Sequence, residues 1–299
     1  MKVVIAGGTG FLGQALVKEF SSRGDEVVVL SRSGKAAQNA KSVQWDGKTV
    51  GDWAQELEGA EAVLNMAGED VFTRWSQSKR ERILTSRVEP TQAIARAIEK
   101  AKRPPAVWVN ASAVGYYGST GDKPVDETSP AGADRLAEVC KQWESAQTDC
   151  LCPETKLSTI RIGFVLGRGG GAFPLLRRLT KLLLGSALGS GKQWVPWIHV
   201  DDVARIFALA VDQRLEGPLN AVGPYPVTNA QLMTELRKQM RRPWAPNVPK
   251  PVLSLGALIK LPPTEVTLAS QRALPGRLQT LGFDYKFPTL ESALADLLA

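Results

Sequence analysis

The chain has 299 residues, of which 43% are hydrophobic, and its formal net charge is +7. No apolar run approaches the ~18 residues of a membrane span, the first apolar stretch is too short for a signal peptide, and no basic block carries interleaved aromatic residues. We therefore expect neither a membrane protein nor a nucleic-acid binder. Three cysteines, an odd number, favour a reducing cytoplasm over a disulfide framework and are too few to predict a metal site.

The first predicted elements are a strand over 2–6 and a helix over 11–22, joined by a glycine-rich turn within VVIAGGTGFLG. A strand, a tight turn and a helix N-terminus form the arrangement that binds the pyrophosphate of a dinucleotide. Glycine lets the backbone approach phosphate where a Cβ would clash. A turn that binds nothing is the alternative interpretation. The residues expected to contact the cofactor here are Gly7, Thr9, Gly10, Phe11, Leu12 and Gly13.

The second predicted strand, over 26–30, indicates which dinucleotide binds. It is followed by Ser31 and Arg32, and no acidic residue comes before Asp46. An NAD site usually carries a carboxylate about 20 residues beyond the glycines, bonded to the ribose 2′-hydroxyl. A hydroxyl and a guanidinium instead favour a 2′-phosphate, although Arg32 could also be an ordinary solvated side chain. The sequence therefore predicts NADP(H).

Further strands are predicted over 42–45, 61–66, 106–111 and 157–163, and helices over 76–101 and 133–148. This alternation is typical of an α/β fold, here a Rossmann-type doubly wound parallel sheet. Asp202 is a candidate N-cap of a helix that precedes a short strand over 218–222. Apolar helical patterns follow over 173–184 and 289–298. We predict a dinucleotide-binding domain over 1–163, to which 198–222 returns, and a smaller C-terminal substrate domain within 164–299.

Polar side chains end two central strands. Asn65-Met66-Ala67-Gly68 follows one, and Asn110-Ala111-Ser112, with Tyr116-Tyr117-Gly118, follows the next. With the glycine turn, these motifs resemble the extended short-chain dehydrogenase/reductases. Further motifs place the resemblance in the "epimerase family protein" branch, related to the human short-chain reductase family 39U and carrying an extra C-terminal domain of unknown function. They include Trp45-Asp46, Ser86-Arg87, Arg161-x-Gly163, Pro196-Trp197-Ile198-His199 and Gln271-Arg272-Ala273-Leu274-Pro275. The resemblance spans the whole chain.

The resemblance implies an NADP(H)-binding oxidoreductase or epimerase-like protein, with further cofactor contacts from Met66, Ala67, Gly68, Arg87, Ser112 and Phe164. One departure is important. These reductases normally use a Tyr as general acid/base with a Lys four residues later on one helix face. Here Leu136 and Cys140 occupy those positions. Ser112 and Tyr117 are the remaining catalytic candidates, whereas His199 is expected to be structural.

Two functions fit these observations. One is hydride transfer between nicotinamide and a carbonyl or carbinol carbon held near Ser112, with the proton supplied by Tyr117, by water or by the substrate. The other is a catalytically inactive NADP-binding regulatory or scaffold protein. The charge distribution adds an expectation about the ligand: residues 164–299 hold 16 Lys/Arg against 9 Asp/Glu, whereas 1–163 balance. We expect the small-molecule substrate of the second domain to be anionic, with Arg177, Arg178 and Lys181 close to it.

Overall fold

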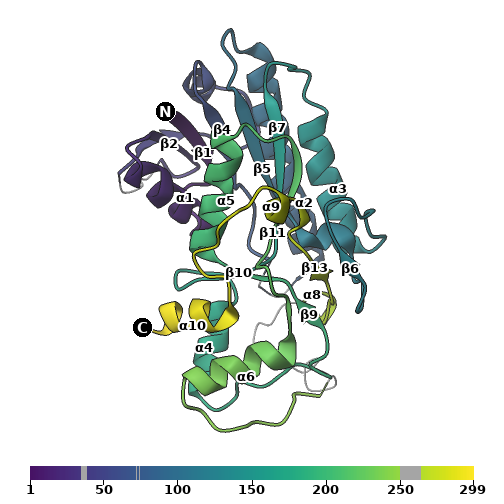
Figure 1. Cartoon of the computed structure of the whole chain (residues 1–299). Coiled ribbons are helices and arrows are strands. Elements are labelled where there is room, and N and C mark those ends of the chain that lie inside the picture. The colour runs from purple at the N-terminus through teal and green to yellow at the C-terminus, as the bar shows by residue number, and fades with distance from the viewer. Residues whose placement is uncertain (35–38, 72, 74, 250–263) are drawn as a thin grey trace.

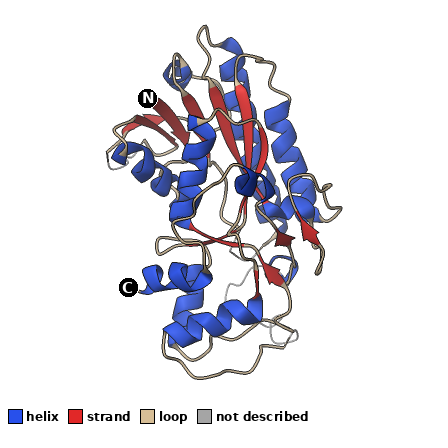
Figure 2. Cartoon of the chain, in the orientation of Figure 1, coloured by secondary structure: helices blue, strands red, loops and turns tan. Residues whose placement is uncertain are grey.

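The computed structural model describes residues 1–34, 39–71, 73, 75–249 and 264–299. Its centre is a seven-stranded sheet in the order β11-β7-β5-β4-β1-β2-β3 (Figures 1 and 2). All neighbouring pairs in this sheet are parallel. The strands are β1 (Lys2–Ala6), β2 (Glu26–Ser31), β3 (Lys41–Gln44), β4 (Ala62–Asn65), β5 (Val107–Ala113), β7 (Lys156–Ile162) and β11 (Gly217–Ala221). The predicted Rossmann-type doubly wound sheet is confirmed.

Helices cover both faces of this sheet. On one face, α1 (Phe11–Ser22) and α5 (Val200–Asp212) pack against alternate strand residues such as Val3 and Ile5. On the other face, α2 (Gln77–Lys100) and α3 (Arg135–Thr148) pack together, and α2 covers the intervening strand residues (Figure 1). Successive strand side chains point to opposite faces, so strands buried on both faces read as continuous apolar runs.

A smaller region lies beyond the carboxyl ends of the strands (Figure 1). Three helices, α4 (Phe173–Lys181), α6 (Asn229–Gln239) and α10 (Leu290–Leu298), enclose its apolar core. Short strand pairs connect it to the sheet: β8 (Phe164–Leu166) with β10 (Trp197–His199), β9 (Trp194–Val195) with β12 (Val227–Thr228), and β6 (Pro124–Val125) with β13 (Arg272–Ala273). The remaining short elements are η1 (Asp52–Leu57), η2 (Val114–Tyr117), α8 (Thr264–Thr267) and α9 (Gly276–Thr280).

The chain crosses between the two regions more than once. Within 198–222, α5 packs on the sheet and β11 joins it, whereas β10 pairs with β8 outside it. The C-terminal stretch also touches the sheet, because Leu278 of α9 is fully buried in the core between the sheet and α5. The division at residue 163 stays a prediction.

The predicted N-cap of α5 is wrong. The cap is His199, whose Nδ1 accepts a hydrogen bond from the backbone N–H of Asp201 at 3.1 Å. Asp202 lies inside the first helical turn and is fully buried. Its carboxylate accepts hydrogen bonds from the backbone N–H groups of Lys286 and Phe287. β10 ends directly at His199, so the helix begins earlier than the Asp-Asp pair suggests, and Asp202 holds the chain leading to α10 instead.

Candidate cofactor and substrate site

The glycine turn after β1 is shaped by two close backbone approaches. Gly7 has φ +77, and a Cβ there would lie 2.9 Å from the carbonyl carbon of Met66. A Cβ on Gly13 would lie 2.2 Å from the oxygen of Gly7, which real atoms do not tolerate. A Cβ on Gly10 would meet only that same oxygen, at 3.3 Å. Gly7 and Gly13 are therefore required for packing, whereas Gly10 faces outward with exposed Thr9.

The N-terminus of α1 opens onto this turn. Gly10 is its N-cap, and no side chain accepts a hydrogen bond from the first-turn N–H groups. The first N–H groups of a helix have no intrahelical partner, so those of Phe11, Leu12 and Gly13 are available to an anion. The helix dipole adds positive potential at the same point. The turn therefore has the properties of a pyrophosphate site, as the sequence predicts.

The ring of Phe11 is held by a second glycine-rich segment. A Cβ on Gly167 or Gly170 would lie 2.5 Å or 2.7 Å from Phe11 atoms. Both glycines belong to the loop between β8 and α4, which the sequence shows only as a run of glycines. This loop therefore packs the smaller region against the first residue of α1.

The end of β2 carries the two residues expected to distinguish the cofactors. Ser31 is buried, and within the described ranges its Oγ has no hydrogen-bond partner. Arg32 is exposed beside it, and its backbone oxygen accepts from Gln44. Orphaned buried hydroxyls are uncommon in proteins, and one beside an exposed guanidinium fits a phosphate group.

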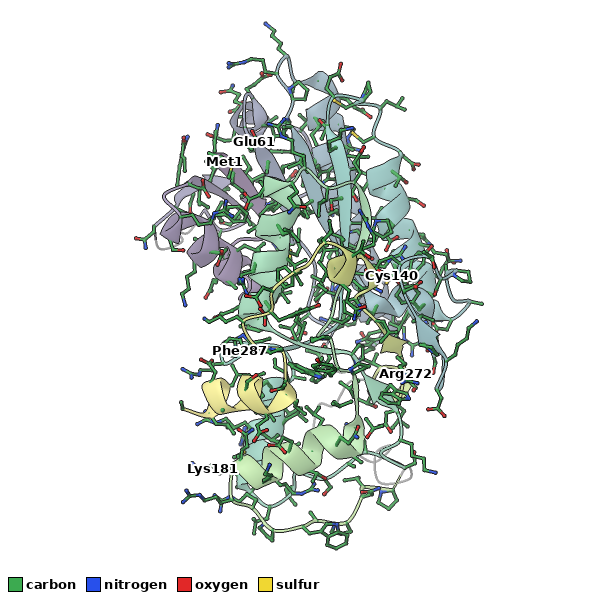
Figure 3. All side chains as sticks on the ribbon, viewed as in Figure 1. Met1, Glu61, Cys140, Lys181, Arg272 and Phe287 are labelled. Atoms are coloured by element: carbon green, nitrogen blue, oxygen red, sulfur yellow. The ribbon has the colours of Figure 1, made fainter. Side chains whose placement is uncertain are left out.

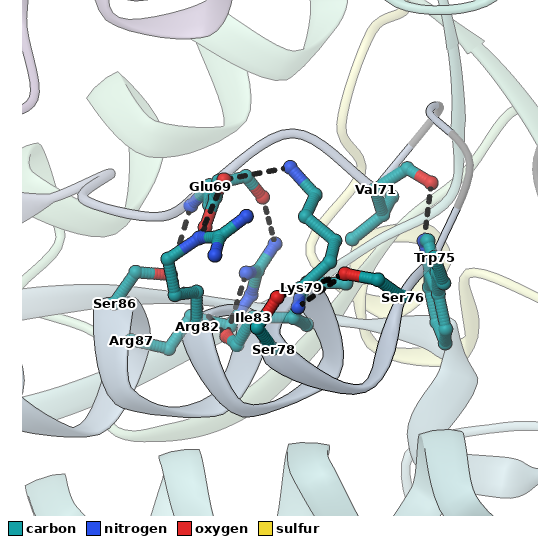
Figure 4. A network of polar contacts seen from close by, with 10 residues as sticks. All are labelled: Glu69, Val71, Trp75, Ser76, Ser78, Lys79, Arg82, Ile83, Ser86 and Arg87. Carbon is teal, nitrogen blue, oxygen red and sulfur yellow. Dashed lines mark hydrogen bonds and ion pairs between the residues drawn. The ribbon is translucent and has the colours of Figure 1, made fainter. Parts of the chain in front are cut away.

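The loop after β4 is held by a polar network at the start of α2 (Figure 4). The carboxylate of Glu69 accepts from Lys79 at 2.8 Å and from Arg82 at 3.2 Å. Arg87 donates to the backbone oxygens of Glu69 and Ile83, and a Cβ on Gly68 would lie 3.3 Å from its guanidinium carbon. Burial lowers the pKa of Arg87 below its ordinary value. Arg87 therefore lies against the Met66–Gly68 loop, which itself contacts Gly7.

A second polar network begins at the end of β5. The Oγ of Ser112 donates to Glu144 at 2.6 Å, and Arg161 donates to both carboxylate oxygens of Glu144. Arg161 also donates to the hydroxyl of Tyr117 at 3.1 Å, and that hydroxyl donates to Asn220 at 2.7 Å. Burial acts to lower the pKa of Arg161, but the hydrogen bonds and charge of Glu144 outweigh it and raise that pKa. The structure thus brings both catalytic candidates into one network.

The sequence did not single out Glu144, Arg161 or Asn220 as members of this network. The available signal was the spacing on α3, where Glu144 follows Cys140 by four residues and so shares its helix face. The partners of Glu144 come from β5 and β7, and sequence spacing cannot pair them.

The positions normally held by the Tyr/Lys pair face the end of β5. The nearest side-chain atoms to a Cβ on Gly115 would be the Cβ of Leu136 and the Sγ of Cys140, both at 3.6 Å. Cys140 is buried on α3 (Figure 3), and burial raises the pKa of its thiol to about 12. Burial likewise raises the pKa of Tyr117 to about 12. Lys141 points away and pairs with Glu138. Neither Cys140 nor Tyr117 releases a proton near neutral pH.

Two other predicted residues lie at the boundary between the regions. Phe164 is in β8, where its N–H donates to the oxygen of Pro196 at 2.7 Å. Its side chain packs against the apolar core of the smaller region. His199 caps α5, as its expected structural role requires, with its ring 4.0 Å from that of Phe287. No described helix is long and apolar enough to cross a membrane. Across the part of the chain that the structure describes, no three His, Cys, Asp or Glu residues gather as metal ligands.

Comparison with known proteins agrees with this geometry. The family model described as "NAD dependent epimerase/dehydratase family" matches residues 3–223, and one for a domain of unknown function, DUF1731, matches residues 248–297. The chain is 35% identical to the chloroplastic SDR39U1 homologue of Arabidopsis thaliana, covering 100% of this chain and 87% of that one. It is 34% identical to human epimerase family protein SDR39U1, with 100% of both chains covered.

A crystal structure of human SDR39U1 with NADPH superimposes with a TM-score of 0.89, at 34% identity and over 99% of each chain. The resemblance inferred from the motifs is therefore confirmed along the whole length. The chain belongs to the NAD-dependent epimerase/dehydratase family, as a relative of the epimerase family proteins SDR39U1.

Proposed function

We propose that the protein binds NADP(H) across the glycine turn and the end of β2 and transfers hydride to or from a carbonyl or carbinol carbon held near Ser112. The observation that carries this proposal is the uncapped N-terminus of α1 beside Gly10, where a Cβ would meet one backbone oxygen and nothing else. The orphaned hydroxyl of Ser31 and exposed Arg32 support a 2′-phosphate. The NADPH-bound human relative supports the same cofactor. Three free cysteines support a cytoplasmic location.

A bound nicotinamide would supply or accept the hydride, and residues of this chain would orient the substrate. Ser112 donates its hydroxyl hydrogen to Glu144, so this hydroxyl must rotate away from the carboxylate to donate to a substrate oxygen. Arg161 holds Glu144 in place with two N–H bonds. Because the thiol of Cys140 and the phenol of Tyr117 both have a pKa of about 12, we assign the proton to water or to the substrate itself.

A second function, cofactor binding without turnover, is favoured by the same network. The hydroxyls of Ser112 and Tyr117 are already bonded to protein partners, and Leu136 stands where the acid/base would be. In that case NADPH acts as a structural or sensing ligand, and its binding raises stability by mass action. Loss of nicotinamide absorbance across a panel of carbonyl substrates separates the two functions, because only the enzyme consumes NADPH.

Cofactor choice provides the direct test of the site. We expect NADPH to bind at least tenfold more tightly than NADH, a difference of about 1.4 kcal/mol that one Arg–phosphate interaction can supply. Arg32→Ala should remove most of this preference, and Ser31→Asp should reverse it by repelling the 2′-phosphate. Fluorescence titration of both cofactors measures the affinities. Equal affinities in the unmutated protein would contradict the NADP(H) assignment.

A further inference from the structure

A basic pocket lies on α4, in the smaller region and apart from the glycine turn. Its six lining residues are Arg168, Phe173, Pro174, Arg177, Arg178 and Lys181, and its volume is about 240 Å³. Lys181 marks its position near α6 at the far end of the molecule from the N-terminus (Figure 3). Four of the six residues are cationic, and Phe173 and Pro174 are apolar. We call this site the α4 pocket.

Three of the four cations form no ion pair among the residues that the structure describes. Arg177, Arg178 and Lys181 are exposed, and none of the described carboxylates lies within 4.0 Å of them. Arg177 and Lys181 are four residues apart on one helix face, where like charges repel by a few tenths of a kcal/mol.

Neighbouring helices show the more common arrangement. Lys238 of α6 pairs with Glu235 at 3.4 Å, and Lys286, before α10, pairs with Asp201 at 2.7 Å. On α4, by contrast, three cations lie together with no such partner among the described residues. They account for part of the excess positive charge in the C-terminal part of the chain.

The fourth cation, Arg168, is held in position by the end of α10. It donates to the backbone oxygens of Leu297, at 3.2 Å, and of Asp296. Its flanking glycine-rich loop packs on the ring of Phe11, the first residue of α1. Arg168 therefore gives the pocket one fixed wall, and the loop that carries it also packs on α1.

We propose that the α4 pocket binds a phosphate-bearing small molecule, separately from the dinucleotide. Guanidinium groups bind phosphate through paired N–H bonds, and three arginines line this pocket. The volume is below the ~300–1,000 Å³ of pockets that enclose drug-sized ligands, which suits a phosphate or diphosphate group with a small attached moiety. The binding groups also differ from those of the glycine turn, where backbone N–H groups face the anion.

Inorganic pyrophosphate is the probe, titrated calorimetrically into the protein saturated with NADPH so that the glycine turn is filled. The double variant Arg177→Gln/Arg178→Gln should bind it at least tenfold more weakly than the unmutated protein. A matched control, Lys100→Gln/Lys123→Gln, removes the same charge from exposed side chains on the other region and should change the affinity less than twofold. Lys181→Gln should give an intermediate loss.

Salt dependence gives a second readout. Raising the ionic strength from about 0.01 M to about 0.15 M shortens the screening length from about 30 Å to about 8 Å and should weaken binding to the exposed cations. Equal losses in both double variants would overturn the proposal in favour of general charge attraction, and so would absence of binding at low salt. NADPH titrations of the same variants test the proposed function independently, because the glycine turn lies between β1 and α1 whereas Arg177 and Arg178 lie on α4.

Discussion

At the scale of single residues, two glycines of the same turn have different roles: Gly13 is needed for packing, whereas Gly10 leaves room for the cofactor. Gly13 is enclosed by the backbone of Gly7 and Gly8, whereas Gly10 has open space on its outer side. Gly10 has φ −77, which any residue adopts. The same residue type therefore serves the packing of α1 at one position and access to phosphate at the other.

We expect Gly10→Ala to change the free energy of unfolding by less than about 1 kcal/mol, because restriction of the unfolded chain offsets the 3.3 Å approach of the new Cβ to the oxygen of Gly7. Its methyl group should weaken NADPH binding at least tenfold. Gly13→Ala is the matched comparison and should cost about 1–3 kcal/mol of stability by overpacking. Urea unfolding and cofactor titration of both variants measure the two effects. A stable Gly13→Ala protein with unimpaired binding would contradict this account of the turn.

At the scale of elements, α3 carries one buried and one exposed ion pair. The side chains of Glu144 and Arg161 are 13% and 5% exposed, whereas those of Glu138 and Lys141 are 52% and 41% exposed. Removing one partner of a buried pair leaves an uncompensated charge, but an exposed pair contributes little. α3 thus contributes a fixed carboxylate at the end of β5.

We expect Glu144→Gln to lower the free energy of unfolding by about 3 kcal/mol or more, because Arg161 remains buried without its carboxylate. Glu138→Gln on the same helix should change it by less than about 1 kcal/mol. Urea denaturation of the two variants provides the comparison. If both variants lose the same small amount, the Glu144–Arg161 pair is solvated in the protein and does not hold Ser112.

At the scale of the whole molecule, His199 lies where the sheet region and the smaller region meet. It caps α5, its ring contacts that of Phe287 at a tilt of 45°, and its Nε2 lies 3.4 Å from the carboxylate of Asp296 on α10. Burial lowers the pKa of His199, although the charges of Asp201, Asp296 and Asp202 act in the opposite direction and Lys286 acts with burial. Because Nδ1 accepts from Asp201, the neutral ring carries its proton on Nε2.

This lowered pKa predicts a pH dependence of stability. In the unfolded chain His199 binds a proton near pH 6.5, whereas in the folded protein its pKa is lower. The contribution of neutral His199 to the free energy of unfolding is therefore complete above pH 6.5. It is lost as the pH falls below this value, because the unfolded chain then takes up a proton that the folded protein does not. The slope is at most about 1.4 kcal/mol per pH unit. Urea unfolding between about pH 7.5 and pH 5.5 should show it.

The chain contains a single histidine, so one variant serves as the control. His199→Asn keeps an acceptor suited to capping α5 but does not titrate. It should be less stable than the unmutated protein at pH 7.5 and should lose the slope between pH 7.5 and 5.5. An unchanged slope in this variant would assign the pH dependence to the carboxylates.

By itself, the sequence determined the features that depend on neighbours along the chain. Strand and helix positions follow from local apolar periodicity, so β1, α1, α2 and α3 lie within two residues of their predicted bounds. The glycine turn, the Ser31-Arg32 pair and the missing Tyr/Lys pair are likewise local patterns. The family resemblance rests on the same motifs.

Only the tertiary structure decided which distant groups meet. Ser112, Glu144, Arg161 and Asn220 come from four elements, and no local pattern pairs a carboxylate on α3 with a guanidinium on β7. The tertiary fold also made His199, rather than Asp202, the cap of α5. The buried carboxylate of Asp202 instead accepts hydrogen bonds from two backbone N–H groups of the segment before α10. It added Arg168 to the basic residues of α4. Such pairings depend on how strands and helices pack, since burial and hydrogen-bond geometry are properties of the folded chain.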